Sequence, residues 1–154
     1  MMIIWQKPFK QSRAVTIEKV FIDTSAFYAL MDRSDRFHQS ASKLWARLLD
    51  KGYYLKTSNY VTVETLALLQ SRLGFEAADL WSRDVLGIVE TLWIDEVLHN
   101  LAFEIWFSLG RKKLSLVDCT SFVIMRQDKM EKVFGYDKHF TDHGFEVLKE
   151  HAFR

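Results

Sequence analysis

The stretch KVFIDTSAFYAL (Lys19–Leu30) decides the fold of this chain. Three apolar residues, Val20–Ile22, run directly into Asp23, and two small hydroxyl residues, Thr24 and Ser25, follow. A short unbroken apolar run is typical of a parallel strand that is buried on both faces. The carboxylate at its end can cap the next helix, or serve a ligand site, or do both, because ligands of parallel sheets bind beyond the carboxyl ends of the strands.

Short apolar runs alternate with helix-periodic segments along the rest of the chain. The sequence predicts strands at residues 20–22, 53–57, 91–94, 132–136 and 145–148, and helices at residues 37–51, 58–74, 76–90, 95–110 and 115–129. Because strands and helices alternate, we expect an α/β domain around a mainly parallel sheet.

Length, charge and cysteine content restrict the class of protein. The chain has 154 residues, and 21 basic against 20 acidic residues give a formal charge of +1, so the overall charge demands no polyanionic partner. One cysteine cannot form a disulfide within the chain, which fits a reducing cytoplasm. No apolar run approaches the ~20 residues that span a bilayer. We expect a cytoplasmic protein with an N-terminal extension at residues 1–17, a tail or an extra strand, and one domain at residues 18–150.

Two further acids lie in apolar surroundings. Glu64 falls within YVTVETLALL and Asp118 within LSLVDCTSFVI, whereas Asp137 follows the predicted strand that ends in VFGY. An isolated buried charge is very costly, so an acid at such a place is paired, protonated or bound to a metal. Asp23 and Asp137 both lie at the carboxyl ends of predicted strands.

Four segments in order carry a family resemblance: VFIDTSAFYAL, SNYVTVETLALL, LSLVDCTSFVIM and VFGYDKHF…GFEVL. Their order and spacing, over Lys19 to Leu148, resemble the PIN domain (PilT N-terminus) nucleases, most of all the small VapC-type toxins of toxin–antitoxin pairs. The resemblance implies a three-layer fold with a doubly wound parallel sheet, and Mg²⁺- or Mn²⁺-dependent cleavage of RNA that leaves a 5′-phosphate. It also implies a possible antitoxin partner and a homodimer, for which residues 75–87 are the candidate face.

Carried over position by position, the resemblance makes Asp23, Glu64, Asp118 and Asp137 the catalytic, metal-binding acids, with Asp23 as a direct ligand. Carboxylate oxygens are the ligands that Mg²⁺ prefers. A bound metal ion polarises a phosphodiester and stabilises charge on the leaving oxygen, which suits in-line attack by water. Without metal, four crowded acids repel one another, so some of their pKa values should be raised.

The resemblance also implies supporting residues. A hydroxyl of Thr24 or Ser25 would support the metal site. Many family members carry Thr or Ser two residues before the fourth acid, where this chain has Gly135, so one hydrogen bond can be missing. Asp142 is close enough in the sequence to share or replace the role of Asp137.

Basic residues precede or follow the expected acids. Arg33 and Arg36 follow the first strand, and Arg111, Lys112 and Lys113 precede the third acid. They can bind RNA phosphates and offset the acidic cluster. The alternative is that they are solvated loop charges.

Simpler interpretations exist for single residues. Ser115 and Asp118 match the capping box S-x-x-D, and Asp137 alone would be a turn residue. His139 and His143 are four residues apart, but the chain lacks the ligand set of a zinc site, so we expect His139 on the surface or facing substrate.

Other functions remain open besides a toxin ribonuclease. One is a PIN-fold protein that processes or binds RNA outside a toxin–antitoxin pair. A phosphatase of the haloacid-dehalogenase type is disfavoured, because Ser25 stands where its second aspartate is needed. Cys119 has no base partner in the sequence that would make it a nucleophile.

Overall fold

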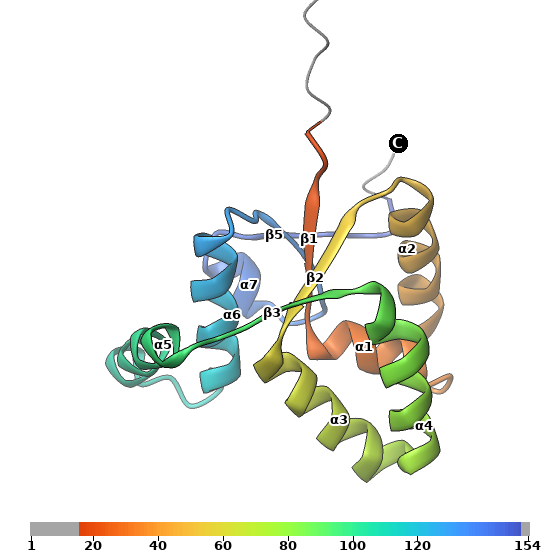
Figure 1. Ribbon diagram of the computed structural model, residues 1–154, viewed down its shortest axis with the longest axis horizontal. Coiled ribbons are helices and arrows are strands. Elements are labelled where there is room, and N and C mark those ends of the chain that lie inside the picture. The colour runs from red at the N-terminus through yellow and green to blue at the C-terminus, as the bar shows by residue number, and fades with distance from the viewer. Residues whose placement is uncertain (1–15, 152–154) are drawn as a thin grey trace, which may run out of the picture.

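The computed structural model describes residues 16–151, in which five parallel strands form one sheet in the order β3-β2-β1-β4-β5 (Figure 1). The strands are β1 (Lys19–Ile22), β2 (Tyr54–Ser58), β3 (Glu90–Leu92), β4 (Lys132–Phe134) and β5 (Glu146–Val147). The predicted α/β fold with a doubly wound parallel sheet is confirmed. Most of the expected N-terminal extension, residues 1–15, lies outside the described residues.

Seven α-helices of the described chain cover the sheet. They are α1 (Thr24–Met31), α2 (His38–Asp50), α3 (Asn59–Leu73), α4 (Phe75–Leu80), α5 (Glu96–Leu109), α6 (Leu116–Gln127) and α7 (His139–Asp142). Figure 1 shows α1, α2 and α4 to the right of the strands and α5 to α7 to the left. This follows from right-handed crossovers, because the chain adds β2 and β3 on one side of β1 and β4 and β5 on the other. No described helix has the length and apolar character needed to cross a membrane.

The central strand explains the apolar run with which the fold begins. Val20, Phe21 and Ile22 are fully buried between β2 and β4, with helices on both faces of the sheet. Their burial removes enough apolar surface from water to stabilise the fold by several kcal/mol, at roughly 1.5–3 kcal/mol per large side chain. The strand that precedes Asp23, β1, is therefore the buried centre of the sheet.

The structure differs from the sequence prediction between α3 and β3. A single helix was expected at residues 76–90, but α4 ends at Leu80, a π-helical turn covers Trp81–Val85 and a 3₁₀ turn covers Leu86–Ile88. Trp81 is fully buried and meets the ring of Phe27 edge to face at 5.0 Å. Gly87 is a poor helix residue, at a cost of about 1 kcal/mol relative to alanine. Core packing of the tryptophan therefore takes precedence over regular helix geometry.

The strand order reverses between β1 and β4, and this point determines where a ligand site can form. The two strands are hydrogen-bonded neighbours, yet their following helices lie on opposite sides of the sheet. The backbone N–H of Asp23 donates to the carbonyl of Phe134 at 3.0 Å, which aligns the carboxyl ends of the two strands. Such a switch point leaves a crevice where ligands of open α/β sheets bind.

Candidate functional site

Asp23 lies at the carboxyl end of β1 and caps α1. Its Oδ2 accepts hydrogen bonds from the Ser25 backbone N–H at 3.2 Å and the Ser25 hydroxyl at 2.7 Å. The residue is only 6% exposed, and burial raises its pKa to about 6 although both Ser25 bonds lower it. The nearby charges of Asp118 and Glu64 raise it further. Asp23 is therefore a helix cap. None of the groups that shift its pKa carries a positive charge that would stabilise the ionised carboxylate.

The Ser25 hydroxyl joins the ends of β1 and β4. Besides donating to Asp23, its oxygen accepts from the backbone N–H of Tyr136 at 2.9 Å. Gly135 lies against this junction: a Cβ atom there would be 3.0 Å from Asp23 Cβ and 3.3 Å from Ser25 Oγ. A threonine or serine at position 135 would be crowded here, and the hydroxyl between the two strand ends comes from Ser25 instead.

Glu64 projects from α3 and is half-buried. Burial raises its pKa, a hydrogen bond with the Thr24 side chain lowers it, and the charge of Asp118 raises it. Thr24 is itself buried and accepts a long hydrogen bond, 3.4 Å, from the Thr65 hydroxyl. The two candidate hydroxyls thus serve different acids: Ser25 contacts Asp23, and Thr24 contacts Glu64.

Asp118 completes a capping box at the start of α6. Its Oδ2 accepts from the Ser115 backbone N–H at 2.9 Å, and its own N–H donates to Ser115 Oγ at 3.0 Å. Burial raises the pKa of Asp118, the Ser115 bonds lower it, and the charge of Asp137 raises it. The capping box uses one carboxylate oxygen, which leaves the other available to the site.

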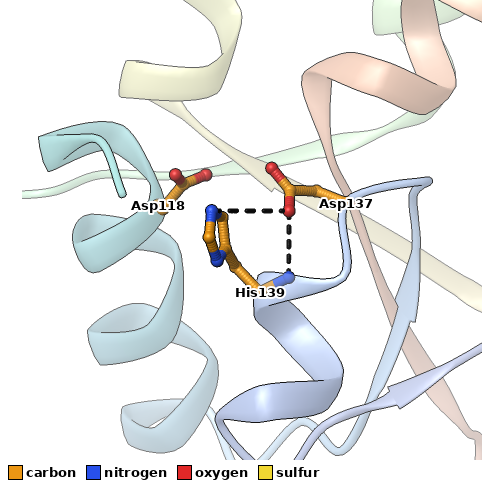
Figure 2. A group of neighbouring side chains, drawn as sticks. All are labelled: Asp118, Asp137 and His139. Atoms are coloured by element: carbon orange, nitrogen blue, oxygen red, sulfur yellow. Dashed lines mark hydrogen bonds and ion pairs between the residues drawn. The ribbon is translucent and has the colours of Figure 1, made fainter. Parts of the chain in front are cut away.

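Asp137 follows β4 and lies beside Asp118, together with His139, a residue expected on the surface or facing substrate. Figure 2 shows the side chains of Asp118, Asp137 and His139 facing one another, and one ligand atom from each lies within 4.8 Å of the others. Asp137 Oδ1 accepts from the His139 backbone N–H at 2.9 Å and lies 3.9 Å from His139 Nε2. The spacing D-x-H could have indicated this, because an aspartate that caps a turn brings the residue two positions later against its carboxylate.

Asp142 and His143 do not belong to this group. Asp142 is on α7 with an exposed side chain, outside the Asp118–Asp137–His139 group. His143 Nδ1 contacts the carbonyl of His139 at 2.8 Å, and its ring stacks on Phe122 with centroids 4.3 Å apart. Its contacts are those of a packing residue.

The five basic residues singled out in the sequence are exposed, but they differ in how close they come to the acids. Arg111, Lys112 and Lys113 lie in the loop before α6, and the carbonyl of Lys113 is 3.0 Å from His139 Nε2. This contact holds the loop against the acidic group. As a result, three exposed basic residues, Arg111, Lys112 and Lys113, lie at the edge of the site.

Arg36 and Arg33 both lie in the turn before α2. The Arg36 guanidinium lies 4.5 Å from the centroid of the Phe37 ring. That ring stacks on Tyr136, the neighbour of Asp137, with centroids 4.1 Å apart and planes within 7°.

The donor set is that of a hard divalent cation. Asp23, Glu64 and Asp118 all have raised pKa values, first because they are buried and further because neighbouring carboxylates repel them. Oxygen ligands of this kind bind Mg²⁺ or Mn²⁺, and a cation would relieve the repulsion. Cys119, behind the site, is buried, and this raises its thiol pKa to about 11, so it is not a nucleophile at neutral pH.

Comparisons with known proteins agree with this architecture. Residues 20–146 match the PIN domain family. The 23S rRNA-specific endonuclease VapC20 of Mycobacterium tuberculosis is 34% identical over 129 residues, which cover 82% of this chain and 95% of the relative. The VapC20 crystal structure, described as that of a sarcin–ricin loop cleaving toxin, superposes with a TM-score of 0.76 at 30% identity and covers 84% of this chain and 98% of that one.

More distant structures share the fold alone. FitAcB of Neisseria gonorrhoeae and DNA-bound VapBC of Salmonella typhimurium each superpose with a TM-score of 0.62 at 13% identity. They cover 85% and 86% of this chain, and each match spans 97% of the other chain. The family match and the relative at 34% identity together show that the chain belongs to the PIN domain family and, within it, to the VapC-type endoribonucleases.

Proposed function

We propose that this chain hydrolyses RNA phosphodiesters with Mg²⁺ or Mn²⁺ bound by Asp23, Glu64, Asp118 and Asp137. One observation carries the proposal: carboxyl groups from the end of β1, α3, α6 and the loop after β4 interact where the strand order reverses, and burial, with a smaller contribution from their mutual repulsion, raises the pKa of Asp23, Glu64 and Asp118. Carboxylates that serve only as helix caps have no reason to be assembled in this way.

Each supporting residue has a defined task in this account. Ser25 holds the Asp23 carboxylate against the Tyr136 backbone, and Thr24 orients Glu64. Ser115 fixes one oxygen of Asp118. A divalent cation, when bound, would polarise the phosphodiester and stabilise negative charge on its oxygens. Arg111, Lys112 and Lys113 on one side and Arg33 and Arg36 on the other would contact neighbouring phosphates of the RNA.

The substrate class we propose is a structured RNA loop of the large ribosomal RNA. VapC20 is named for its action on 23S rRNA and cleaves the sarcin–ricin loop. Sequence-specific RNA recognition targets unpaired bases in loops, which can reach a crevice at a sheet edge. This chain would act in the cytoplasm, where ribosomes are.

The experiment is cleavage of purified ribosomal RNA by the full chain, with Mg²⁺, with Mn²⁺ and with excess EDTA. We expect discrete cuts that require the metal, map to one loop and leave a 5′-phosphate. Cleavage that is unaffected by EDTA would contradict the proposal, and so would intact RNA at every metal concentration.

We further propose a homodimer and an antitoxin as protein partners. Exposed apolar side chains support this: on α5, Val97 and Phe107 are 74% and 76% exposed, and Leu101 and Phe103 are also exposed. These four residues are called the α5 apolar face below. Large apolar side chains exposed on one helix support a protein–protein interface there. Within the candidate face at residues 75–87, Phe75 and Leu80 are exposed, but Trp81 is fully buried and unavailable to a partner.

A further inference from the structure

We propose that His139 Nε2 is a metal ligand, and that the centre is a mixed nitrogen–oxygen site that discriminates against Mg²⁺ in favour of transition metals. The proposal rests on the metal site of the proposed function, and it adds a ligand that the four-carboxylate arrangement lacks. Its basis is the position of His139 between Asp118 and Asp137 (Figure 2).

The spacing of the three side chains suits a single ion. One ligand atom each from Asp118, Asp137 and His139 lies within 4.8 Å of the others, and Nε2 is 3.9 Å from Asp137 Oδ1. In an octahedron with bonds of about 2.1 Å, ligand atoms are about 3 to 4.2 Å apart. Only small side-chain movements separate the observed positions from such a geometry.

The His139 imidazole is largely buried, but only one of its two nitrogens has a hydrogen-bonding partner. Its side chain is 11% exposed, and Nδ1 is buried with no hydrogen-bonding partner. Nε2 contacts one acceptor, the carbonyl of Lys113 at 3.0 Å. A carbonyl oxygen can only accept, so in this arrangement Nε2 carries the proton and Nδ1 is the nitrogen without one. Moving the proton to Nδ1 frees the Nε2 lone pair for a metal, at the cost of the contact with Lys113 and of a buried Nδ1–H without an acceptor.

The identity of the ligand determines which metal is preferred. Mg²⁺ takes oxygen ligands and retains its waters, whereas imidazole nitrogen suits first-row transition metals. With one nitrogen among carboxylate oxygens, the centre would bind Mn²⁺ or Co²⁺ more tightly than Mg²⁺. An all-carboxylate site without the histidine would show a smaller difference.

Pulsed electron paramagnetic resonance on the Mn²⁺-loaded, RNA-free full chain tests the proposal directly. We expect a ¹⁴N coupling from a directly bound imidazole, replaced by a ¹⁵N coupling when the chain carries ¹⁵N-labelled histidine. The coupling should disappear in His139→Gln. The coupling should persist in the control variant His38→Gln. In the wild type, His38 contacts the carbonyl of Ala29 at 2.8 Å. A wild-type chain with bound Mn²⁺ but no nitrogen coupling would overturn the proposal without any variant.

Metal affinity gives a second readout. His139→Gln should weaken Mn²⁺ binding by about tenfold or more and Mg²⁺ binding by less than about threefold, as measured by calorimetry. Equal losses for both metals would contradict the proposal, and metal-free thermal unfolding checks that the variant is folded. Neither measurement uses RNA. Cleavage with Mg²⁺ in the absence of nitrogen coupling would therefore overturn this inference alone, whereas nitrogen coupling without cleavage would contradict only the proposed function.

Discussion

Ionisation of the buried Asp23 carboxyl group destabilises the folded chain. Its pKa rises from 3.8 to about 6 because it is buried, so the folded chain holds this proton more tightly than the unfolded chain does. The stability of the metal-free chain should therefore fall as pH rises from about 4 to about 6. A pKa shift of this size lowers the free energy of unfolding of the metal-free chain by about 3 kcal/mol at neutral pH.

Asp23→Asn removes that cost, so we expect the metal-free variant to be more stable than wild type by about 1–3 kcal/mol at pH 8. Asparagine still accepts the Ser25 hydrogen bonds as a helix cap. Urea unfolding in EDTA at pH 5 and pH 8 measures the effect. The gain should be small at pH 5. A variant that is clearly less stable than wild type at pH 8 would instead make Asp23 a purely structural cap.

A substitution at Gly135 tests whether close packing against Asp23 matters for the site. In Gly135→Ala the new Cβ would lie 3.0 Å from Asp23 Cβ and must displace the carboxylate by a few tenths of an ångström. We expect a stability loss of about 1–3 kcal/mol and a clear drop in RNA cleavage. Gly87→Ala is the matched control, because nothing lies within 4 Å of a Cβ there. Equal effects of the two substitutions would contradict the close-packing account.

Some site residues could be predicted from the sequence, and others could not. Glu64 and Asp118 stood out because charges within apolar runs need a reason, and Asp23 and Asp137 because they follow predicted strands. The division of labour between Thr24 and Ser25 could not be predicted, since it depends on contacts between β1, α3 and the loop after β4. The burial of His139 was missed because it depends on the turn capped by Asp137, which gives no periodic signal.

At the scale of elements, the capping box of α6 separates structural from chemical roles. Ser115→Ala removes the hydroxyl that accepts from the Asp118 N–H, and we expect a stability loss of about 1 kcal/mol. Cleavage should fall much less than in Asp118→Asn, because the backbone N–H of residue 115 still donates to Asp118 Oδ2. Chemical denaturation and cleavage assays measure the two effects. If Ser115→Ala abolished cleavage, the hydroxyl would have a role beyond the cap.

The strands and long helices were predictable because their apolar periodicity is set by burial. The parallel sheet followed from the alternation of elements, and the structure confirms it. The π-helical turn at Trp81–Val85 was not predictable, because it results from packing Trp81 against Phe27, a contact 54 positions away in the chain. The short helix α7 likewise depends on the Asp137 turn.

For the whole molecule, the exposed apolar surface predicts association. Phe107→Ser in the α5 apolar face should shift the chain toward monomer in sedimentation velocity, because it removes a side chain that is 76% exposed. Phe75→Ser, at 66% exposure, tests the face expected from the sequence. A loss of the dimer only in Phe75→Ser would assign the interface to residues 75–87, and a wild-type monomer at all concentrations would contradict the homodimer.

The central claim is that the carboxylates at the end of the sheet form one catalytic metal site. The most direct measurement is the single-turnover rate of RNA cleavage at saturating Mg²⁺ for the wild type, Asp118→Asn, Asp137→Asn and Asp142→Asn. We predict losses of about 100-fold or more for the first two variants and a rate near wild type for Asp142→Asn, whose side chain is exposed outside the group. Wild-type rates in Asp118→Asn and Asp137→Asn would contradict the account.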